Sequence, residues 1–523
     1  MNQNGELAGA TLAHLAGLGV KHVVVCAGAR NAPLVTSLLA TEGKADWRIW
    51  HHFDERSAAF FALGMSKKSW EPVAVVTTSG TAVAELLPAV IEAFYSGVPL
   101  VLVTADRPAT YRGSGAPQAI EQVGIFGPYA PVALDVTGGL DLSEVVKWNR
   151  DVPLHLNVCF EEPTPDDTIR DFDPITLLHA VKHCGDDHVL TIETFVANPN
   201  GLVVLVGELP PSWHQPVQDF LVALGVPVWA EATSGLRESE QLAPLLIRAE
   251  REVDQLSPRE ILRIGGVPSL RFWRDLESLE EISVLSVTRR PFSGLARLSR
   301  ILVLAEFPRW SEGFSPLRKI ESASLHKGLR TSLRRCLENH PGSEPAMMRA
   351  VSELIPEEAL VYLGNSLPIR EWNLAASIQP RHPRCYASRG ANGIDGQIAT
   401  FLGLSETEEE SWGIFGDLTA LYDLNAPALL RQLPGARRRI VILNNGGGKI
   451  FSRLPSLSGL TRSGKQVTEN HHRQSFEHWA AMWNLDYVKW QAGEEKPKID
   501  GAGVVIEVCV DGDATEAFWS DWK

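Results

Sequence analysis

The sequence predicts an α/β protein made of three doubly wound domains with parallel sheets. Three times along the chain, short apolar segments rich in β-branched residues alternate with helical segments. Such alternation is typical of parallel strands joined by helical crossovers. Continuous apolar runs such as VVVCAG and LVLVTAD indicate strands covered on both faces. At 523 residues the chain is also too long for one core, and at roughly 150 residues per domain it forms about three domains.

The three series define the predicted domains. The first runs from residue 20 to about 136, with strands expected in VKHVVVCAG, WRIWHHF, PVAVVTTSG and VPLVLVTAD. The second has expected strands in GLVVLVGE, VPVWAEAT, ILRIGG, ISVLSVT and RILVLAEF. The third begins near Ala346, with strands in ALVYLGNS, RCYASRG, SWGIFGD, RRRIVILNN and GVVIEVCV. An acidic stretch near 163–187 and a polar stretch near 325–345 are the expected joints. The predicted domains are therefore residues 1–180, 181–340 and 341–523.

Composition and charge exclude several classes of protein. The apolar share of 44% and the charged share of 21% are ordinary for globular domains. The net charge of −14 and the scattered Lys and Arg residues argue against a nucleic-acid partner. No apolar run approaches the roughly 18 residues of a membrane helix, and the first residues do not resemble a signal peptide. We therefore expect a cytoplasmic protein without membrane insertion.

Two other kinds of site are missing from the sequence. The six cysteines are far apart and form no Cys-x-x-Cys pair, and no histidine cluster has zinc spacing, which predicts reduced thiols. No expected strand is followed by Gly-x-Gly-x-x-Gly, which argues against a dinucleotide-dependent dehydrogenase.

A diphosphate and metal site is predicted at two strand ends of the third series. Gly416 and Asp417 follow the apolar run WGIF, and Asn445 stands in the strand-end sequence ILNNGGGKIF. Because ligands bind beyond the carboxyl ends of parallel strands, these segments can converge. Mg²⁺ prefers oxygen ligands, which the Asp417 carboxylate, the Asn445 amide and the Gly447 carbonyl can supply. Glycines after Asn445 let the backbone approach a diphosphate, and the helix after Asp417 offers amide hydrogens.

Each motif also has a simpler interpretation. A Gly-Asp pair after a strand is more often a turn, and Asn-Asn-Gly-Gly is more often a loop. The occurrence of both at strand ends, 28 positions apart from Asp417 to Asn445, favours the functional site.

Glu55 is the candidate acid of the site. It follows the apolar strand in WRIWHHF and opens a helix rich in small residues, where a carboxyl group would be partly buried and its pKa raised. Alternatively, Asp54 and Glu55 only cap the helix, because acidic side chains favour its positive end. The residues alone leave both roles open.

Four arginines follow expected strands and suit acidic substrates. They are Arg30 in CAGARNAPL, Arg107 in TADRP, Arg370 in GNSLPIR and Arg389 in YASRGANGIDG. Guanidinium groups bind carboxylates through two parallel hydrogen bonds. For any one of them, a structural ion pair is the alternative.

These motifs resemble those of thiamine-diphosphate enzymes, whose signature runs from Gly-Asp-Gly to Asn-Asn over about this interval. Leu418 departs from that signature, but GDLTALYDLNAPALLRQ is close to the sequence of one family, the 2-succinyl-5-enolpyruvyl-6-hydroxy-3-cyclohexene-1-carboxylate (SEPHCHC) synthases. The resemblance covers most of the chain. It is densest in the AGAR region, in HFDER with TSGTAVAELLPAVIEA and TADRP, in NSLPIR with SRGANGIDG, and in GDLTALYDLN with NNGGGKIFSRLP.

The resemblance implies the fold of thiamine-diphosphate enzymes and a transferase of menaquinone or phylloquinone biosynthesis. In that family 2-oxoglutarate loses CO₂ and its succinyl semialdehyde unit adds to isochorismate in a 1,4-addition. It also implies a pyrimidine-binding N-terminal domain, a C-terminal domain that binds the diphosphate with Mg²⁺ or Mn²⁺, and a homodimer with shared active sites. Whether dimers pair into tetramers stays open.

The resemblance further assigns roles to residues that bind the cofactor. Glu55 would activate it through the aminopyrimidine ring. Ile394, in RGANGIDG, would be the apolar residue beneath the folded cofactor, with ordinary core packing as the alternative. The segment Gly416, Asp417, Leu418 would act together with Asn445 and Gly447 at the diphosphate and metal.

Substrate contacts follow from the same resemblance. Ser366 and Arg370 would hold the succinyl carboxylate. Isochorismate or its adduct would meet Arg30, Arg107, Gln118 and Arg389. A basic residue of the central domain, Arg271 or else Arg274, would replace a lysine of the family.

The chain departs from the family near the acceptor. The family usually has Pro-Gly-Ser-Arg-Ser where this chain has Ala27-Gly28-Ala29-Arg30-Asn31, so two hydroxyls are lost, and Pro117 stands where asparagine is common. These departures concern the contacts to isochorismate and not the reaction type.

Two other functions stay open. One is an acetolactate-synthase-like carboligase or decarboxylase that acts on smaller oxo acids, which a flavin site or a shortage of arginines would favour. The other is a catalytically silent α/β binding subunit, which the loss of Glu55 or of the metal ligands would favour. The sequence has all of these residues.

Overall fold

The structure is a computed structural model that describes most of the chain. The described residues are 3–138, 145, 148–164, 167, 172, 186–198, 200–308, 327–433, 435–457 and 459–522. The expected joint at 163–187 and the domain boundary at 180 therefore lie largely outside them. The boundary at 340 follows directly on helix α10 (Lys327–Asn339).

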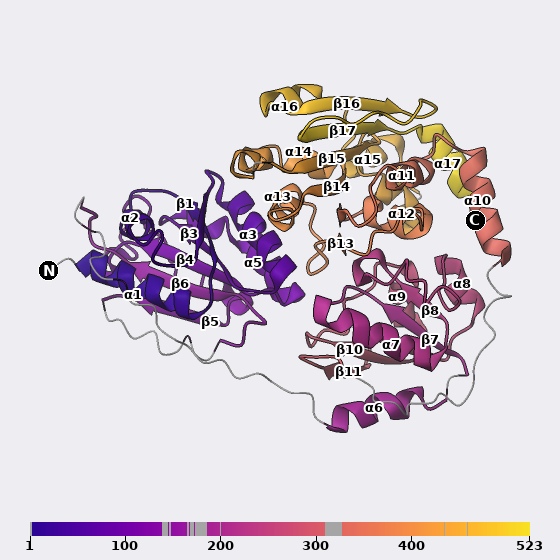
Figure 1. Ribbon diagram of the computed structural model, residues 1–523, viewed down its shortest axis with the longest axis horizontal. Coiled ribbons are helices and arrows are strands. Elements are labelled where there is room, and N and C mark those ends of the chain that lie inside the picture. Colours follow the sequence, from indigo (N-terminus) through magenta and orange to yellow (C-terminus); the bar gives the residue numbers. More distant parts are fainter. Residues whose placement is uncertain are drawn as a thin grey trace. The chain divides into compact units, whose positions relative to one another are not determined.

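The named strands form three parallel sheets, which confirms the predicted fold class (Figure 1). The first sheet has the order β2-β1-β3-β4-β6-β5, with β1 (His22–Cys26), β2 (Arg48–His51), β3 (Val73–Thr77), β4 (Leu100–Asp106), β5 (Val132–Val136) and β6 (Leu154–Cys159). The central sheet has the order β11-β10-β9-β7-β8, with β7 (Leu202–Val206), β8 (Val228–Ala230), β9 (Glu260–Ile264), β10 (Ser283–Thr288) and β11 (Arg300–Val303).

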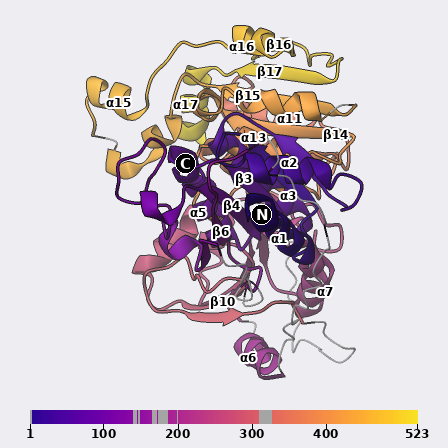
Figure 2. The same ribbon diagram turned by 90° about the vertical axis from the view of Figure 1, so that its left-hand side faces the viewer.

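The third sheet repeats the strand order of the first. Its order is β13-β12-β14-β15-β17-β16, with β12 (Leu360–Leu363), β13 (Cys385–Tyr386), β14 (Glu410–Gly416), β15 (Arg437–Asn444), β16 (Asp486–Gln491) and β17 (Gly503–Cys509). Strands β15, β17 and β16 lie side by side in both views (Figure 1, Figure 2). In each of the two sheets the order reverses between the first and third strands, and this reversal is where ligands bind in open α/β sheets.

Helices connect most of the strands. The first part of the chain has α1 (Gln3–Gly17), α2 (Ala32–Ala40), α3 (Glu55–Ser69), α4 (Thr81–Ala84) and α5 (Leu87–Ser96). The central part has α6 (Asp186–Val196), α7 (His214–Leu224), α8 (Glu250–Gln255) and α9 (Arg271–Asp275). The last part has α10, α11 (Glu344–Ser352), α12 (Leu367–Ala375), α13 (Gln397–Leu404), α14 (Asp417–Tyr422), α15 (Arg462–Thr468), α16 (Glu477–Met482) and α17 (Gly512–Asp521). Short 3₁₀ helices are η1 (Ala109–Tyr111), η2 (Gly127–Tyr129), η4 (Pro211–Trp213), η5 (Ala232–Ser234), η6 (Leu276–Ser278), η8 (Ala426–Gln432), η9 (Lys449–Arg453) and η10 (Pro455–Leu457).

The chain forms two compact units. Unit 1 comprises Met1–Val181, Gly390–Thr407 and Tyr422–Gly435, and so contains the first sheet together with α13 and η8. Unit 2 comprises Lys182–Arg389, Glu408–Leu421 and Ala436–Lys523, and so contains the central and third sheets.

The central sheet shows why its strands are continuously apolar. Leu202, Val204 and Val206 of β7 belong to one buried cluster, whereas Val203 and Leu205 belong to another. Because successive side chains of a strand point to opposite faces, both faces of this sheet are covered.

Three strands were not expected from the sequence. The edge strands β5 and β16 are largely half-exposed or exposed, so they lack an apolar run. Strand β6 is fully buried but carries His155 and Asn157, whose polarity hid it.

Two further expectations concern the whole chain. No helix in the described part is long and apolar enough to cross a membrane. The five described cysteines are free thiols, and Cys184 lies outside the described residues.

Candidate active site

Three predicted site residues of unit 1 each follow a strand of the first sheet. Arg30 comes after β1, Glu55 after β2 and Arg107 directly after β4. The ends of β1 and β3 are close together, because a Cβ atom on Gly28 would lie 2.5 Å from the Thr78 side chain. These loops therefore share the edge of the sheet at which a ligand is expected.

Asp54 and Glu55 have different roles at the start of α3. Asp54 is the N-cap residue, and its carboxylate accepts hydrogen bonds from the backbone amide and the hydroxyl of Ser57, each 3.1 Å long. Burial alone would raise the pKa of Asp54, but hydrogen bonds from Ser57 and Asn425 outweigh it and lower the pKa. Asp54 is thus the residue that caps the helix, so the Glu55 side chain is not needed as the N-cap.

Glu55 is half-buried at the first position of the helix. Burial raises its pKa against the hydrogen bond from its own amide, and the charges of Asp54 and Glu85 add to the rise. Burial also raises the pKa of the Cys26 thiol at the end of β1, and the charge of Glu55 contributes. Glu55 is therefore a carboxyl group beside the ends of β1 and β2 that keeps its proton more readily than usual.

Arg30 is engaged in structural contacts. Its buried guanidinium donates to the carbonyls of Phe160 and Glu161 and to the Glu162 carboxylate, 2.9 Å away. The fully buried Asn31 donates to the Cys26 carbonyl and accepts from the Gly28 amide, each over 2.9 Å. Arg30 thus connects the loop after β1 to the segment after β6. Asn31 stabilises the loop through hydrogen bonds within it.

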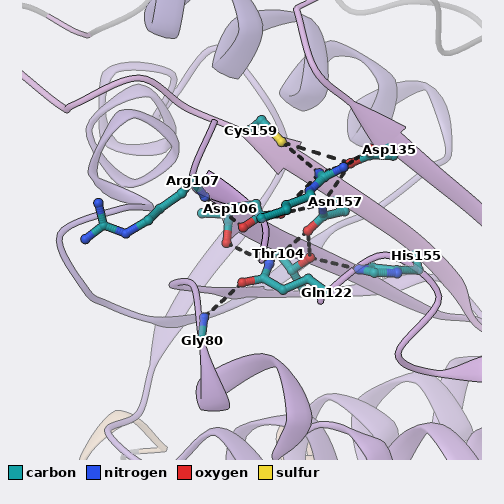
Figure 3. A network of polar contacts seen from close by, with 11 residues as sticks. Gly80, Thr104, Asp106, Arg107, Gln122, Asp135, His155, Asn157 and Cys159 are labelled. Atoms are coloured by element: carbon teal, nitrogen blue, oxygen red, sulfur yellow. Dashed lines mark hydrogen bonds and ion pairs between the residues drawn. The ribbon is translucent and has the colours of Figure 1, made fainter. Parts of the chain in front are cut away.

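A polar network centred on the buried Asp106 and Asn157 holds the loop that carries Arg107 and Gln118. Asp106 accepts the Arg107 amide (2.8 Å) and the Asn157 side chain (3.0 Å), and Asn157 also donates to Asp135 (2.9 Å). Arg112 binds both oxygens of Asp135, each at 2.7 Å. Figure 3 shows Asp106, Asn157 and Asp135 in line across the ends of their strands. Asn157, one of the two polar residues that hid β6 in the sequence, is thus buried and paired.

Gln122 joins this network to the loop after β3. Its side chain accepts the Gly80 amide (2.9 Å) and donates to the carbonyl of Ala105 (3.1 Å) and to Asn157 (2.9 Å) (Figure 3). Above it, Arg107 donates to the Pro117 carbonyl over 2.9 Å, and the exposed Gln118 has a φ of 56°. Such a conformation is uncommon for residues other than glycine and concentrates at functional sites.

Ile394 is half-buried in the bend that precedes α13. The bend is fixed by Asp423, which accepts the amides of Gly396 (2.8 Å) and Ile398 (2.9 Å). Glu92 of α5 accepts the Gly390 and Ala391 amides at 2.8 and 2.6 Å and so holds the start of the same segment. Ile394 is not a fully buried core residue, in keeping with an apolar surface for a ligand.

In unit 2 the predicted metal ligands lie together. The buried Asp417 follows β14 and starts α14, and its Oδ2 accepts the amides of Asn445 (3.1 Å), Gly446 (2.8 Å) and Gly447 (3.0 Å). Its Oδ1 accepts the Leu418 amide at 2.6 Å. The pKa of Asp417 is raised overall, because the effect of burial exceeds the lowering by nearby His472 and by the amide hydrogen bonds. The two strand ends therefore converge as expected.

The Asn445 side chain has one free end. Its Nδ2 donates to both carboxyl oxygens of Glu344, at 3.0 and 3.1 Å, whereas its buried Oδ1 has no hydrogen-bond partner among the described residues. Gly447 has a φ of 141°, and a Cβ atom there would lie 2.5 Å from the Glu469 carbonyl. Only glycine suits this position. A free amide oxygen, a buried carboxylate and a bare backbone loop fit a divalent cation and a diphosphate.

Three predicted substrate residues gather around the start of α12. Ser366 stands at its N-cap with a φ of 72°, and Arg370 donates to the Ser366 carbonyl over 2.6 Å. Arg389 donates to Asn365 over 3.1 Å, and Asn365 in turn donates to the Ser388 carbonyl over 2.8 Å. Ser366 therefore has a strained backbone conformation beside Arg370, and its neighbour Asn365 contacts Arg389.

The surroundings of Arg370 are rich in charge. Although part of the side chain reaches solvent, desolvation lowers the pKa of Arg370, and the charges of Arg389 and Arg274 lower it further. Glu231, which is fully buried and accepts both the amide and the hydroxyl of Ser269 at 2.5 Å, acts in the opposite direction. Arg271, by contrast, is exposed and pairs with Asp275 at 3.3 Å. Of the two central arginines, Arg274 is the one whose charge acts on Arg370.

Comparisons with known proteins agree with this geometry. Residues 6–125 match the family model described as the thiamine pyrophosphate enzyme, N-terminal TPP binding domain. The SEPHCHC synthase of Bdellovibrio bacteriovorus is 41% identical to this chain, with 99% of this chain and 98% of that protein covered. The chain belongs to the SEPHCHC synthase family. The synthase of Akkermansia muciniphila is 40% identical over the same shares, and that of Chloroflexus aurantiacus is 32% identical, covering 92% of this chain and 89% of its own.

Membership of the SEPHCHC synthase family confirms several predictions. The chain is a thiamine-diphosphate-dependent enzyme of the transferase class, as the resemblance implied. Within the SEPHCHC synthase fold, the residues around Asp417 fit the diphosphate end of that cofactor.

Some residues of this site gave no signal in the sequence. Glu344 lies 101 positions before Asn445 and belongs to no motif. Gln122 and Asn157 are single polar residues in ordinary surroundings. Their burial and their contacts could be found only from the structure.

Proposed function

We propose that this SEPHCHC synthase family member decarboxylates 2-oxoglutarate and adds the resulting succinyl semialdehyde unit to isochorismate. The product is SEPHCHC, an intermediate of menaquinone or phylloquinone biosynthesis. The full-length similarity to synthases of that name carries the proposal. Arg107, Arg370 and Arg389 support it, because both substrates carry carboxylates, which guanidinium groups bind well.

Asp417, Asn445 and Gly447 bind Mg²⁺, or Mn²⁺ in its place, in this proposal. The free Oδ1 of Asn445 and the buried Asp417 carboxylate support this assignment. Gly416 and Leu418 line the diphosphate beside Asp417. When bound there, thiamine diphosphate would supply the nucleophilic carbon that decarboxylation and transfer of the acyl group require.

Glu55 holds the proton that the aminopyrimidine ring needs. Its raised pKa and its freedom from helix capping support this role. Ile394 offers an apolar surface beneath the cofactor rings, which favours their folded conformation. Both residues therefore prepare the cofactor and do not touch the diphosphate.

The substrates are bound by the arginines. Ser366 and Arg370 bind the distal carboxylate of 2-oxoglutarate, and Arg274 is favoured over Arg271 as the central-domain contact. Arg107, Gln118 and Arg389 bind isochorismate. Arg30 joins them by exchanging its partner Glu162, whose side chain is 83% exposed, for a substrate carboxylate.

The assembly is a homodimer with shared active sites, in the cytoplasm. Its domains are those predicted, with residues 1–180 binding the pyrimidine and residues 341–523 the diphosphate and metal. The family resemblance supports these assignments.

The donor preference tests this proposal. Purified protein with thiamine diphosphate and Mg²⁺ should release CO₂ from 2-oxoglutarate, and faster when isochorismate is present. Pyruvate should be a poor donor, because it lacks the second carboxylate. Equal or faster turnover of pyruvate would instead favour an acetolactate-synthase-like enzyme.

A further inference from the structure

The start of helix α11 places a buried carboxyl group against the Asn445 side chain. Ser343 caps the helix through the Ala346 amide (3.4 Å), and the Glu344 amide donates to Thr515 of α17 over 3.0 Å. These bonds fix the backbone of Glu344, whose side chain is 1% exposed. Its carboxyl group is therefore a rigid part of the core.

The contact with Glu344 determines the orientation of the Asn445 side-chain amide. A side-chain amide has a donating nitrogen and an accepting oxygen of nearly equal shape, so its neighbours decide its orientation. Both oxygens of Glu344 accept from Nδ2, at 3.0 and 3.1 Å. An ionised carboxyl group has no hydrogen to donate, so it can only accept. Next to an ionised Glu344, the Asn445 nitrogen therefore faces the carboxylate, and Oδ1 faces away.

The backbone of Asn445 is fixed as well. Its backbone amide donates to Oδ2 of Asp417 over 3.1 Å, so the residue is held on both sides. Oδ1 is left buried and without a hydrogen-bond partner in the described chain. An unpaired buried carbonyl oxygen is costly unless a ligand completes it.

We infer that Glu344 is a positioning residue that presents the Asn445 amide oxygen to the metal ion. This inference rests on the proposed metal site and extends it to a residue that does not touch the metal. Partners that orient metal ligands typically contribute about 10- to 100-fold to metal affinity. The chain also offers a matched control in Glu371, a fully buried carboxyl group near Glu344 whose oxygens have no hydrogen-bond partner among the described residues.

The first test is the Mg²⁺ dependence of thiamine diphosphate binding, measured by calorimetry on cofactor-free protein. In Glu344→Gln the new amide can donate towards Asn445, so the orientation of Asn445 is no longer fixed. The Mg²⁺ concentration for half-maximal cofactor binding should rise about 10- to 100-fold. Glu371→Gln should leave it unchanged. An unaltered Mg²⁺ requirement in a folded Glu344→Gln variant would overturn the inference.

A second test exchanges donor and acceptor. In Glu344→Gln with Asn445→Asp, the glutamine donates to the aspartate, which still has an oxygen for the metal. This double variant should need less Mg²⁺ than either single variant, because Asn445→Asp alone sets two carboxylates against each other. If Glu344→Gln fails to fold, the comparison of the double variant with Asn445→Asp decides alone. A double variant that needs as much Mg²⁺ as Asn445→Asp contradicts the inference. Absence of Mg²⁺-dependent binding in the wild-type protein would contradict the proposed metal site itself.

Discussion

The backbone amide of Gly80 donates to Oε1 of Gln122 over 2.9 Å, at the floor of the loop that carries Arg107 and Gln118. Gln122 is fully buried, and through Asn157 it is connected to Asp106 and Asp135. Thr104 connects Asn157 to His155, with contacts of 2.9 and 2.8 Å. Burial lowers the pKa of His155 to about 4, so the ring is neutral. The loop over the first sheet is thus supported by buried polar groups with defined partners.

Replacing Gln122 by Leu should loosen this loop. The Gly80 amide and the Ala105 carbonyl lose their partner, which costs about 1–3 kcal/mol of unfolding free energy. KM for isochorismate should rise more than KM for 2-oxoglutarate. Denaturant unfolding and steady-state kinetics measure the two effects. Gln215→Leu, at an exposed position on α7, is the control and should change neither. Equal rises in both KM values would remove Gln122 from acceptor positioning.

The fold was largely predictable, and the site only in part. Strands such as β1 and β4 contain apolar runs that are buried on both faces of the first sheet, so the sequence shows them directly. Strand β6 was missed because its buried His155 and Asn157 belong to a network that only the fold assembles. That the segments of Asp417 and Asn445 lie together could be predicted, because neighbouring strand ends converge by topology. Glu344 comes from a helix far away in sequence, and its partner could not be inferred.

Glu55→Gln should separate cofactor activation from cofactor binding. The variant loses the acid but leaves the Asp417 segment intact, so the affinity for thiamine diphosphate should stay nearly unchanged. Turnover should fall roughly 10²- to 10⁴-fold, the usual contribution of a general acid or base. Calorimetry and product formation give the two numbers. Near-normal turnover would remove Glu55 from the mechanism.

Asp54→Ala should lower the stability of the folded protein, because Asp54 caps helix α3. Loss of an N-cap costs about 0.5–2 kcal/mol of unfolding free energy. The pKa of Asp54 is lowered in the folded state, so its contribution is present above the ordinary pKa of 3.8 and is lost as pH falls through the lower folded value. The difference in unfolding free energy between wild type and Asp54→Ala should therefore shrink below about pH 4. A difference that stays constant down to pH 2 would show that the ionised carboxylate is not the capping group.

Arg370→Ala should distinguish dicarboxylate from monocarboxylate donors. Loss of a charged hydrogen-bond donor to the distal carboxylate should lower kcat/KM for 2-oxoglutarate roughly 10- to 100-fold. The slow reaction with pyruvate should change little. Comparable losses for both donors would show that Arg370 does not bind the distal carboxylate.

Mixed dimers test whether active sites are shared. Glu55→Gln and Asp417→Ala chains should each be inactive alone. If they are co-refolded at 1:1 and pair at random, half of the dimers are mixed, and roughly a quarter of all sites contain only intact halves. About a quarter of wild-type activity should return. Persistent inactivity in a mixture that contains heterodimers would mean that each site is built within one chain.

Mass spectrometry of the carboligation product tests the proposed function most directly. Purified protein is incubated with thiamine diphosphate, Mg²⁺, 2-oxoglutarate and isochorismate, and the reaction is repeated without each component. We expect one adduct whose mass is the sum of the two substrates minus CO₂, formed only in the complete mixture and in step with CO₂ release. Release of CO₂ from 2-oxoglutarate with no such adduct, while isochorismate stays intact, would contradict it.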